Sequence, residues 1–212
     1  MSELETAIMF AQNYDNTKLY SIKSDLIQGS SERTAYRNLK QLSYLGLARL
    51  HRRQFRISSV IHQPLGIIKK LLPSIKSLKS ARRFGKYYNQ SDISFVQNKI
   101  DYESVTLDYK AWQLTRFQNP STLYIYVKDM TKTTNILKDN GFHSGVKGNV
   151  VILPIIGDIS EEVDRTYMDS IAKGDRNIFD AIALEIRYKD RIKTKGIFSL
   201  QDILHVQENL NA

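Results

Sequence analysis

The sequence has 212 residues, enough for one large domain or two small ones. Its 42% hydrophobic and 25% charged residues are an ordinary globular composition, which excludes a disordered chain. It contains no cysteine, which excludes disulfides, thiolate metal sites and cysteine nucleophiles. No apolar run approaches the roughly 18 residues of a membrane span, and no secretory leader is recognisable. We therefore expect a cytoplasmic protein that does not enter a membrane.

Positive charge is concentrated in the first part of the chain. Residues 1–90 contain 16 Lys or Arg against 5 Asp or Glu, a net charge of +11. Residues 91–212 contain 15 against 17, a net charge of −2. This asymmetry is expected when one module of a protein meets a polyanion and another does not. A solvated basic surface without a ligand is the alternative.

Two helices are expected in the first 30 residues. Apolar residues at helical spacing predict the first helix over residues 3–14. The second is short: Ser21 is a suitable N-cap, and Ile22 and Leu26 belong to its apolar side. Gly29 provides the turn that follows it.

A third helix is expected from Ser30 or Ser31, either of which can cap it, to Leu45. Gly46 is the expected left-handed residue after its end. On a helical wheel the apolar and polar residues lie on opposite sides. The apolar side consists of Ala35, Leu39, Leu42 and Leu45. The other side consists of Arg33, Arg37, Lys40, Gln41 and Tyr44.

A basic hairpin is predicted after this helix. Residues 47–51 and 55–58 have the pattern of two strands, joined by Arg52, Arg53 and Gln54. Helix, short helix, turn, helix and hairpin form the layout of a winged helix-turn-helix, whose second motif helix enters the major groove of DNA. The sequence therefore predicts an α+β fold that begins with a winged helix-turn-helix domain over residues 1–62.

The cations of the third helix and the hairpin predict contacts with double-stranded DNA. Lys and Arg gain affinity by displacing condensed counterions from phosphates, and residues near the helix start reach base edges. The predicted DNA-binding residues are Ser31, Arg33, Thr34, Tyr36, Arg37, Lys40, Gln41, Arg52, Arg53, Gln54 and Arg56. Winged helices also dock proteins, so protein docking is the alternative, and Tyr36 or Tyr44 could instead cover the edge of the core.

Residues 63–90 are expected to form a basic connector. From Pro64 to Ser80, apolar residues recur at intervals of three or four and lysines occupy the remaining face. This pattern predicts an amphipathic helix bent near Pro73. The helix could pack on the second domain, mediate dimerisation or lie on a membrane surface, in that order of preference, because its apolar side carries no Trp or Phe.

Residues 91–212 have alternating elements that indicate a small mixed α/β domain. Strands are predicted at 123–127 and within 148–156, and helices at 131–139, 160–172, 177–190 and 199–210. The stretch from residue 92 to 117 is ambiguous. Val105, Leu107 and Tyr109 alternate like a strand, whereas the residues after them fit either type of element.

Three stretches of this second domain resemble a known family. They are "LDYKAWQLTRFQNPSTLYIYVKD", "GFHSGVKGNVVILPI" and "GDRNIFDAIALEI". Behind a predicted winged helix, they look like the AbiEi-type antitoxins and transcriptional regulators. The resemblance implies operator binding through the winged helix, repression of the protein's own operon and neutralisation of a nucleotidyltransferase-type toxin. It implies no catalytic residue; the DNA contacts it implies are Arg33, Thr34, Tyr36, Arg37 and the hairpin arginines.

The sequence offers no catalytic or metal site, so we expect neither an enzyme nor a cofactor. The histidines, which are scattered without the helical spacing of a metal site, are His51, His62, His143 and His205. The acidic cluster from Asp158 to Asp164 is explained by a helix start capped by Ser160, where the helix dipole favours carboxylates. A nucleic-acid-processing enzyme is the weakest of three hypotheses.

The leading hypothesis is a sequence-specific transcriptional regulator that binds double-stranded DNA and represses its own toxin–antitoxin operon. Such domains usually gain specificity by reading two half-sites, so we expect a homodimer on an inverted repeat. The second hypothesis is a protein-binding antitoxin or adaptor whose main partner is a toxin.

Overall fold

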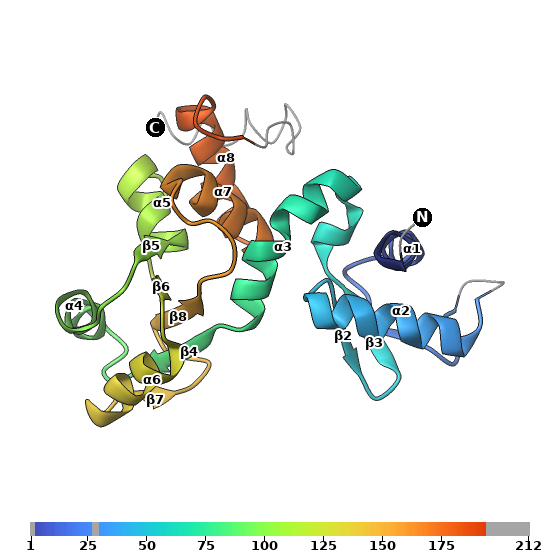
Figure 1. Ribbon diagram of the computed structural model, residues 1–212, viewed down its shortest axis with the longest axis horizontal. Coiled ribbons are helices and arrows are strands. Elements are labelled where there is room, and N and C mark those ends of the chain that lie inside the picture. The colour runs from blue at the N-terminus through green and yellow to red at the C-terminus, as the bar shows by residue number, and fades with distance from the viewer. Residues whose placement is uncertain (1–2, 27–29, 194–212) are drawn as a thin grey trace. The chain divides into compact units, whose positions relative to one another are not determined.

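The computed structural model describes residues 3–26 and 30–193 and has a mixed α+β fold with two sheets (Figure 1). The chain divides into an N-terminal unit, Met1–Lys76, and a C-terminal unit, Ser77–Ala212. The division lies within helix α3 (Leu65–Lys79), the predicted amphipathic helix, which contains Pro73. Each unit is described by itself below.

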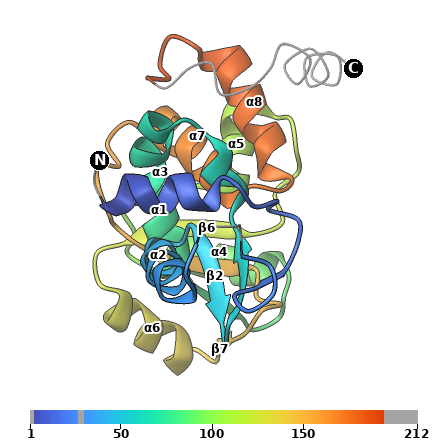
Figure 2. The same cartoon turned by 90° about the vertical axis from the view of Figure 1, so that its right-hand side faces the viewer.

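The N-terminal unit contains two helices and a three-stranded antiparallel sheet of order β1-β3-β2 before α3 begins. Its elements are α1 (Glu3–Ala11), β1 (Tyr20–Ser21), α2 (Glu32–Leu45), β2 (Ala48–His51), β3 (Gln54–Ile57) and a 3-10 turn (Ser59–His62). Helix α2 lies beside the hairpin of β2 and β3 (Figure 2).

The limits of α2 are set by its own sequence. The Ser31 hydroxyl accepts a hydrogen bond from the backbone N–H of Thr34 at 3.1 Å, which satisfies a donor of the first turn. Gly46 has φ 80° and ends the helix, and the Leu47 N–H returns to the Leu42 carbonyl at 2.8 Å. The predicted N-cap and C-terminal glycine are therefore confirmed.

The core of the N-terminal unit joins α1, α2 and the sheet. Ala7, Ile8 and Ala11 of α1 are buried, as are Ala35, Leu39 and Leu42 on the predicted apolar side of α2. Rings from three segments meet beneath the sheet: Tyr14 contacts Tyr20 and Phe55, each with ring centroids 5.0 Å apart. Burial of rings and aliphatic side chains supplies most of the stability of such a unit.

The prediction of a short second helix is wrong for residues 22–26. These residues form turns, and the preceding Tyr20 and Ser21 pair with Phe55 and Gln54 as strand β1. Ser21 caps a single turn, because its N–H donates to Asp25 Oδ2 at 2.6 Å and its carbonyl accepts from the Asp25 N–H at 2.9 Å. Residues 27–29, which belonged to the same prediction, lie outside the described residues.

The C-terminal unit is built on a five-stranded sheet of order β5-β6-β8-β4-β7. Strands β6 and β8 are parallel, and the other pairs are antiparallel. The strands are β4 (Arg82–Gly85), β5 (Ser104–Thr106), β6 (Leu123–Val127), β7 (His143–Ser144) and β8 (Val150–Pro154). The helices are α4 (Gln90–Lys99), α5 (Leu107–Thr115), α6 (Met130–Asp139), α7 (Glu162–Lys173) and α8 (Asn177–Tyr188).

Helices cover both faces of this sheet (Figure 1). Helices α4 and α6 pack on the face that carries Phe84, Ile125 and Ile152. The opposite face, with Tyr126 and Leu153, packs against α5, and α7 and α8 continue that layer. Because both faces are buried, β6 is apolar at every position, as expected for a central strand between two helical layers.

Strands β4 and β7 and helix α4 of this unit were not predicted. Strand β4 lies in the segment 63–90 that the sequence assigned to a connector, and α4 lies in the ambiguous stretch. The alternation from Val105 to Tyr109 is split: the strand ends at Thr106, and Leu107, at φ 53°, turns the chain into α5. The predicted helix at 199–210 lies outside the described residues.

The loop from His143 to Gly148 covers the outer edge of β4. The Gly145 N–H donates to the Arg83 carbonyl at 3.1 Å, and Arg83 donates through Nη1 to the Gly148 carbonyl at 2.9 Å. Gly148 lies so close to β4 that a Cβ atom there would stand 2.2 Å from the Phe84 carbonyl oxygen. The close approach explains why position 148 is a glycine, so the residue needs no phosphate-binding role to account for it.

Candidate nucleic-acid interface

The predicted DNA-binding residues lie on the surface of the N-terminal unit. Ten of the eleven are exposed, and Gln41 is half-buried. The exposed ones are Ser31, Arg33, Thr34, Tyr36, Arg37, Lys40, Arg52, Arg53, Gln54 and Arg56. Tyr36 and Tyr44 are 47% and 78% exposed, so neither closes the edge of the core.

Part of this set surrounds an open hollow of about 550 Å³ between α2 and the hairpin tip. We call it the basic hollow; it is lined by Ile22, Glu32, Arg33, Tyr36, Leu50, Arg52 and Arg53. Three arginines, one glutamate and two aliphatic residues therefore line the same hollow. The Ile22 N–H donates to the Arg53 carbonyl at 2.8 Å, which holds the hairpin tip beside the segment that precedes α2.

The hairpin turn holds two arginines in an unfavourable backbone conformation. His51 pairs with Gln54, so Arg52 and Arg53 form a two-residue turn, with φ 51° and 106°. Turns of this kind favour Asn and Gly, because other residues with positive φ are strained. Each such residue costs free energy that the rest of the structure has to supply. The turn is therefore suited to presenting two cations rather than only joining two strands.

The outer face of the hairpin carries a second pair of cations. Arg56 lies directly opposite Arg49, and both are exposed, whereas Leu50 and Phe55 face the core. Like charges directly opposite each other on two strands destabilise a sheet. The sequence prediction included Arg56 but missed Arg49, although the alternation of residues 47–51 already placed Arg49 on the polar face.

The predicted residues thus do not all lie on one surface. Arg33, Tyr36, Arg52 and Arg53 surround the basic hollow, whereas Gln54 and Arg56 point away from the side of the hairpin that carries Leu50. Arg37 and Lys40 extend the exposed side of α2 beyond the hollow. Arg33 and Arg37, four positions apart on a helix, repel each other, and a bound polyanion would relieve that repulsion.

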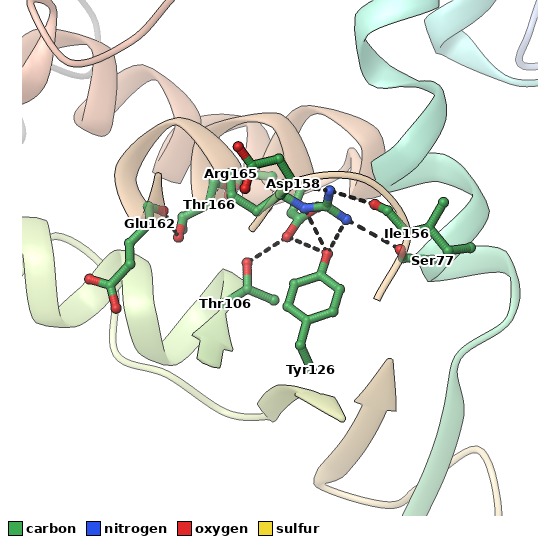
Figure 3. Close-up of polar contacts among 10 residues, drawn as sticks. Ser77, Thr106, Tyr126, Ile156, Asp158, Glu162, Arg165 and Thr166 are labelled. Atoms are coloured by element: carbon green, nitrogen blue, oxygen red, sulfur yellow. Dashed lines mark hydrogen bonds and ion pairs between the residues drawn. The ribbon is translucent and has the colours of Figure 1, made fainter. Parts of the chain in front are cut away.

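The most extensive polar network of the described residues is buried in the C-terminal unit and centres on Arg165 (Figure 3). Its Nε lies 3.0 Å from Asp169 Oδ1 and donates to the Tyr126 hydroxyl at 2.9 Å. The Tyr126 hydroxyl donates to Asp169 Oδ2 at 2.8 Å, and so does Thr106 at 2.7 Å. Burial raises the pKa of Tyr126 above its usual range, and Asp169 raises it further.

This network joins elements rather than forming an open site. Arg165 also donates to the Ser77 hydroxyl at 3.2 Å and to the Ile156 carbonyl at 2.9 Å, so it connects α3, α7, β6 and the segment after β8. Arg165 is 7% exposed and Asp169 is fully buried. The two buried charges are thus paired with each other and hydrogen-bonded to neighbouring groups, as buried charges require.

A second buried group contains two carboxyls. Asn177 Nδ2 donates to Asp108 at 2.9 Å and to Asp180 at 3.4 Å, and Gln118 donates to Asp180 at 3.2 Å. Burial and then the neighbouring Asp108 raise the pKa of Asp180 to about 7. Ser121 donates to Asp108 at 3.2 Å.

The carboxylates of the acidic cluster from Asp158 to Asp164, at the start of α7, make contacts within the protein. Glu162 forms an ion pair with Lys110 at 2.7 Å, and Asp164 accepts from the Lys193 N–H at 2.8 Å. Ser160 does not cap α7 as predicted, because Glu161 holds the N-cap position and makes no side-chain cap; the Ser160 N–H donates to Asp158 Oδ1. Within residues 3–26 and 30–193, no group of three or more His, Asp or Glu side chains could hold a metal ion. Over the same residues, no helix has the length and apolar character needed to cross a bilayer.

Comparison with known proteins adds no family assignment. The sequence matches no family model, and neither a curated protein nor a solved structure matches the chain. The likeness to the AbiEi-type regulators therefore depends on the three quoted stretches of the C-terminal unit.

Proposed function

We propose that this protein is a DNA-binding protein whose N-terminal unit acts as a winged helix-turn-helix. Its particular role is that of a sequence-specific transcriptional regulator, with α2 as the helix that enters the major groove. The carrying observation is the convergence of Arg33 of α2 with Arg52 and Arg53 of the hairpin around the basic hollow. Cations that converge from two elements provide the electrostatic footprint that a duplex requires.

The order of elements supports this assignment. A helix, a short strand, a capped helix and a hairpin follow one another, and β1 adds to the free side of β3. In this arrangement α2 keeps one side for the core and one for a ligand. Residues 22–26 depart from the expected motif, because they form turns instead of its second helix.

The arginines that repel each other or have a strained backbone support the proposal of a polyanionic ligand. The facing pair of Arg49 and Arg56 and the positive φ values of Arg52 and Arg53 each cost stability in the free protein. A duplex offers closely spaced phosphates that would reward all four side chains. The resemblance to the AbiEi-type regulators adds the proposal of autorepression, and reading of an inverted repeat by a homodimer follows from the usual use of such domains.

A double substitution tests the proposal. Arg33→Ala/Arg37→Ala removes two cations of α2, so affinity for duplex DNA should fall and the logarithmic salt slope should flatten by about 0.9 for each phosphate contact that is lost. Arg187→Ala/Lys189→Ala removes two exposed cations from the end of α8 and serves as the matched control. Unchanged affinity and slope in a folded Arg33/Arg37 variant would remove DNA binding from this helix.

The second candidate function is protein binding by the C-terminal unit, as a toxin-neutralising antitoxin would require. It is favoured by Tyr87 and Tyr88, which are 61% and 54% exposed. Asp92 fixes their loop by accepting from the backbone N–H groups of residues 86, 87 and 88. Rigidly held, exposed tyrosines are typical of protein interfaces.

Co-purification tests this second function. The neighbouring gene product should be retained by the full chain and by Arg33→Ala/Arg37→Ala, and lost from Tyr87→Ala/Tyr88→Ala. Retention by the tyrosine variant would remove the role from this loop.

A further inference from the structure

Glu32 is the carboxylate among the lining residues of the basic hollow. It is the first residue of α2, and its side chain is 54% exposed. Its Oε2 lies 3.5 Å from Nη1 of Arg53 at the hairpin tip. An acidic side chain on a surface that meets phosphates repels them, so its presence there needs a reason beyond general electrostatics.

The helix dipole gives only part of that reason. A carboxylate in a first helical turn is favoured by roughly 0.3–1 kcal/mol. The cap of α2 is already supplied by the Ser31 hydroxyl, which accepts from the Thr34 N–H. Among the described residues, the contact of the Glu32 carboxylate is with Arg53, across the hollow, and not with a backbone N–H of its own helix.

We propose that Glu32 is a specificity-determining residue that accepts a hydrogen bond from the N4 amino group of a cytosine in the major groove. The inference rests on the proposed function and deepens it. An ionised carboxylate is an acceptor only. Cytosine presents an amino donor, whereas guanine and thymine present acceptors that repel a carboxylate and adenine places the acceptor N7 beside its amino group.

The surroundings of Glu32 suit this role. Arg53 has several N–H donors, so one can orient the Glu32 carboxylate while the others remain for a phosphate. Ile22 and Leu50 line the same hollow, so apolar surface lies beside the carboxylate. Arg33, the next residue, carries the donor fork that matches guanine O6 and N7. Glu32 and Arg33 together would therefore read cytosine and guanine.

Selection of bound duplexes from a random pool tests the inference with the full chain. Wild type should enrich cytosine at one position of each half-site, with a preference of about 5- to 150-fold in affinity over the other bases. Glu32→Gln should change the preference at that position to adenine, because an amide pairs with adenine N6 and N7. Glu32→Ala should bind with little preference there.

The control is Glu3→Gln, which removes an exposed negative charge from α1. Like the Glu32 variants, Glu3→Gln loses one negative charge and should raise the affinity for duplexes of any sequence. It should not change a base preference. Thermal unfolding verifies that each variant is folded. Selection of the same bases by wild type, Glu32→Gln and Glu32→Ala would overturn the inference alone. Absence of duplex binding by wild type would overturn the proposed function and this inference together.

Discussion

Arg49 and Arg56 face each other across β2 and β3, and both side chains are exposed on the outer side of the hairpin. A sheet designed only for stability would place opposite charges or a β-branched pair at this position. The facing arginines therefore place a local cost on the N-terminal unit, which the proposed binding of DNA would offset.

Removing this repulsion should stabilise the unit and weaken DNA binding. For Arg49→Thr we expect the free energy of unfolding to rise by about 0.2–1 kcal/mol, because Thr also favours strands. Urea unfolding measures stability, and a duplex titration should show weaker binding. Lys18→Thr is the control: Lys18 lies 3.9 Å from Asp15, so its loss removes a charge without relieving repulsion. Lower stability of Arg49→Thr would contradict the cost that we assign to the pair.

At the hairpin turn, too, we expect a substitution that stabilises the unit to weaken DNA binding. In Arg53→Gly, a residue at φ 106° becomes one that adopts this conformation freely, so we expect a gain of about 1 kcal/mol in unfolding free energy. The salt slope of duplex binding should flatten by about 0.9. Arg116→Gly is the matched control, because Arg116 also has positive φ, 58°, but lies at the end of α5. Equal slopes in the two variants would exclude Arg53 as a phosphate contact.

Asp180 should give the C-terminal unit a pH-dependent stability. Its pKa rises from an ordinary 3.8 to about 7 on folding, so the folded state binds more protons than the unfolded chain between these values. The free energy of unfolding should therefore fall as the pH increases from about 4 to about 7. Asp180→Asn, which stays neutral, should lose much of this decrease.

Urea midpoints at pH 5 and pH 8 measure the difference. Asp180→Asn should exceed wild type in stability more at pH 8 than at pH 5. The Asp139→Asn variant, at an exposed end of α6, should follow the wild-type pH dependence. A wild-type stability that rises over this range and an unchanged rise in Asp180→Asn would rule out the protonated state at position 180.

The buried ion pair of Arg165 should be far more important for stability than an exposed one. Arg165→Met leaves Asp169 charged and buried, so we expect a loss of about 3–5 kcal/mol. Lys128→Met removes the exposed partner of Glu103, at 2.7 Å, and should cost less than about 1 kcal/mol. Guanidinium unfolding of both variants measures the contrast. Similar losses would show that solvent reaches the Arg165 network.

The sequence predicted those elements whose signals are local. Ser31 and Gly46 determine the two ends of α2, and the continuous apolar run of β6 identified a buried strand. Strand β1 was missed because two residues carry no periodicity, and their pairing with Phe55 arises from distant contacts. Strand β4 was missed for a related reason: the arginines at 82 and 83 read as continued surface charge, whereas they pair with Ile152 and Val151.

The candidate site was predictable only in part. Helical periodicity placed Arg33 and Arg37 on an exposed side, since that inference needs only one element. Convergence of Arg33 with Arg53 depends on the Ile22 contact that fixes the hairpin tip, and no sequence pattern encodes that distance. The contact of Glu32 with Arg53 could not be predicted for the same reason, because the two residues lie 21 positions apart.

The contact between Gly148 and β4 holds the outer edge of β4 covered. A side chain at position 148 would collide with the Phe84 carbonyl and lift the His143–Gly148 loop from the strand. The backbone groups of β4 that the loop now occupies would then be free to pair with a strand from another molecule. A single methyl group at this glycine would thus turn a capped sheet margin into a template for aggregation.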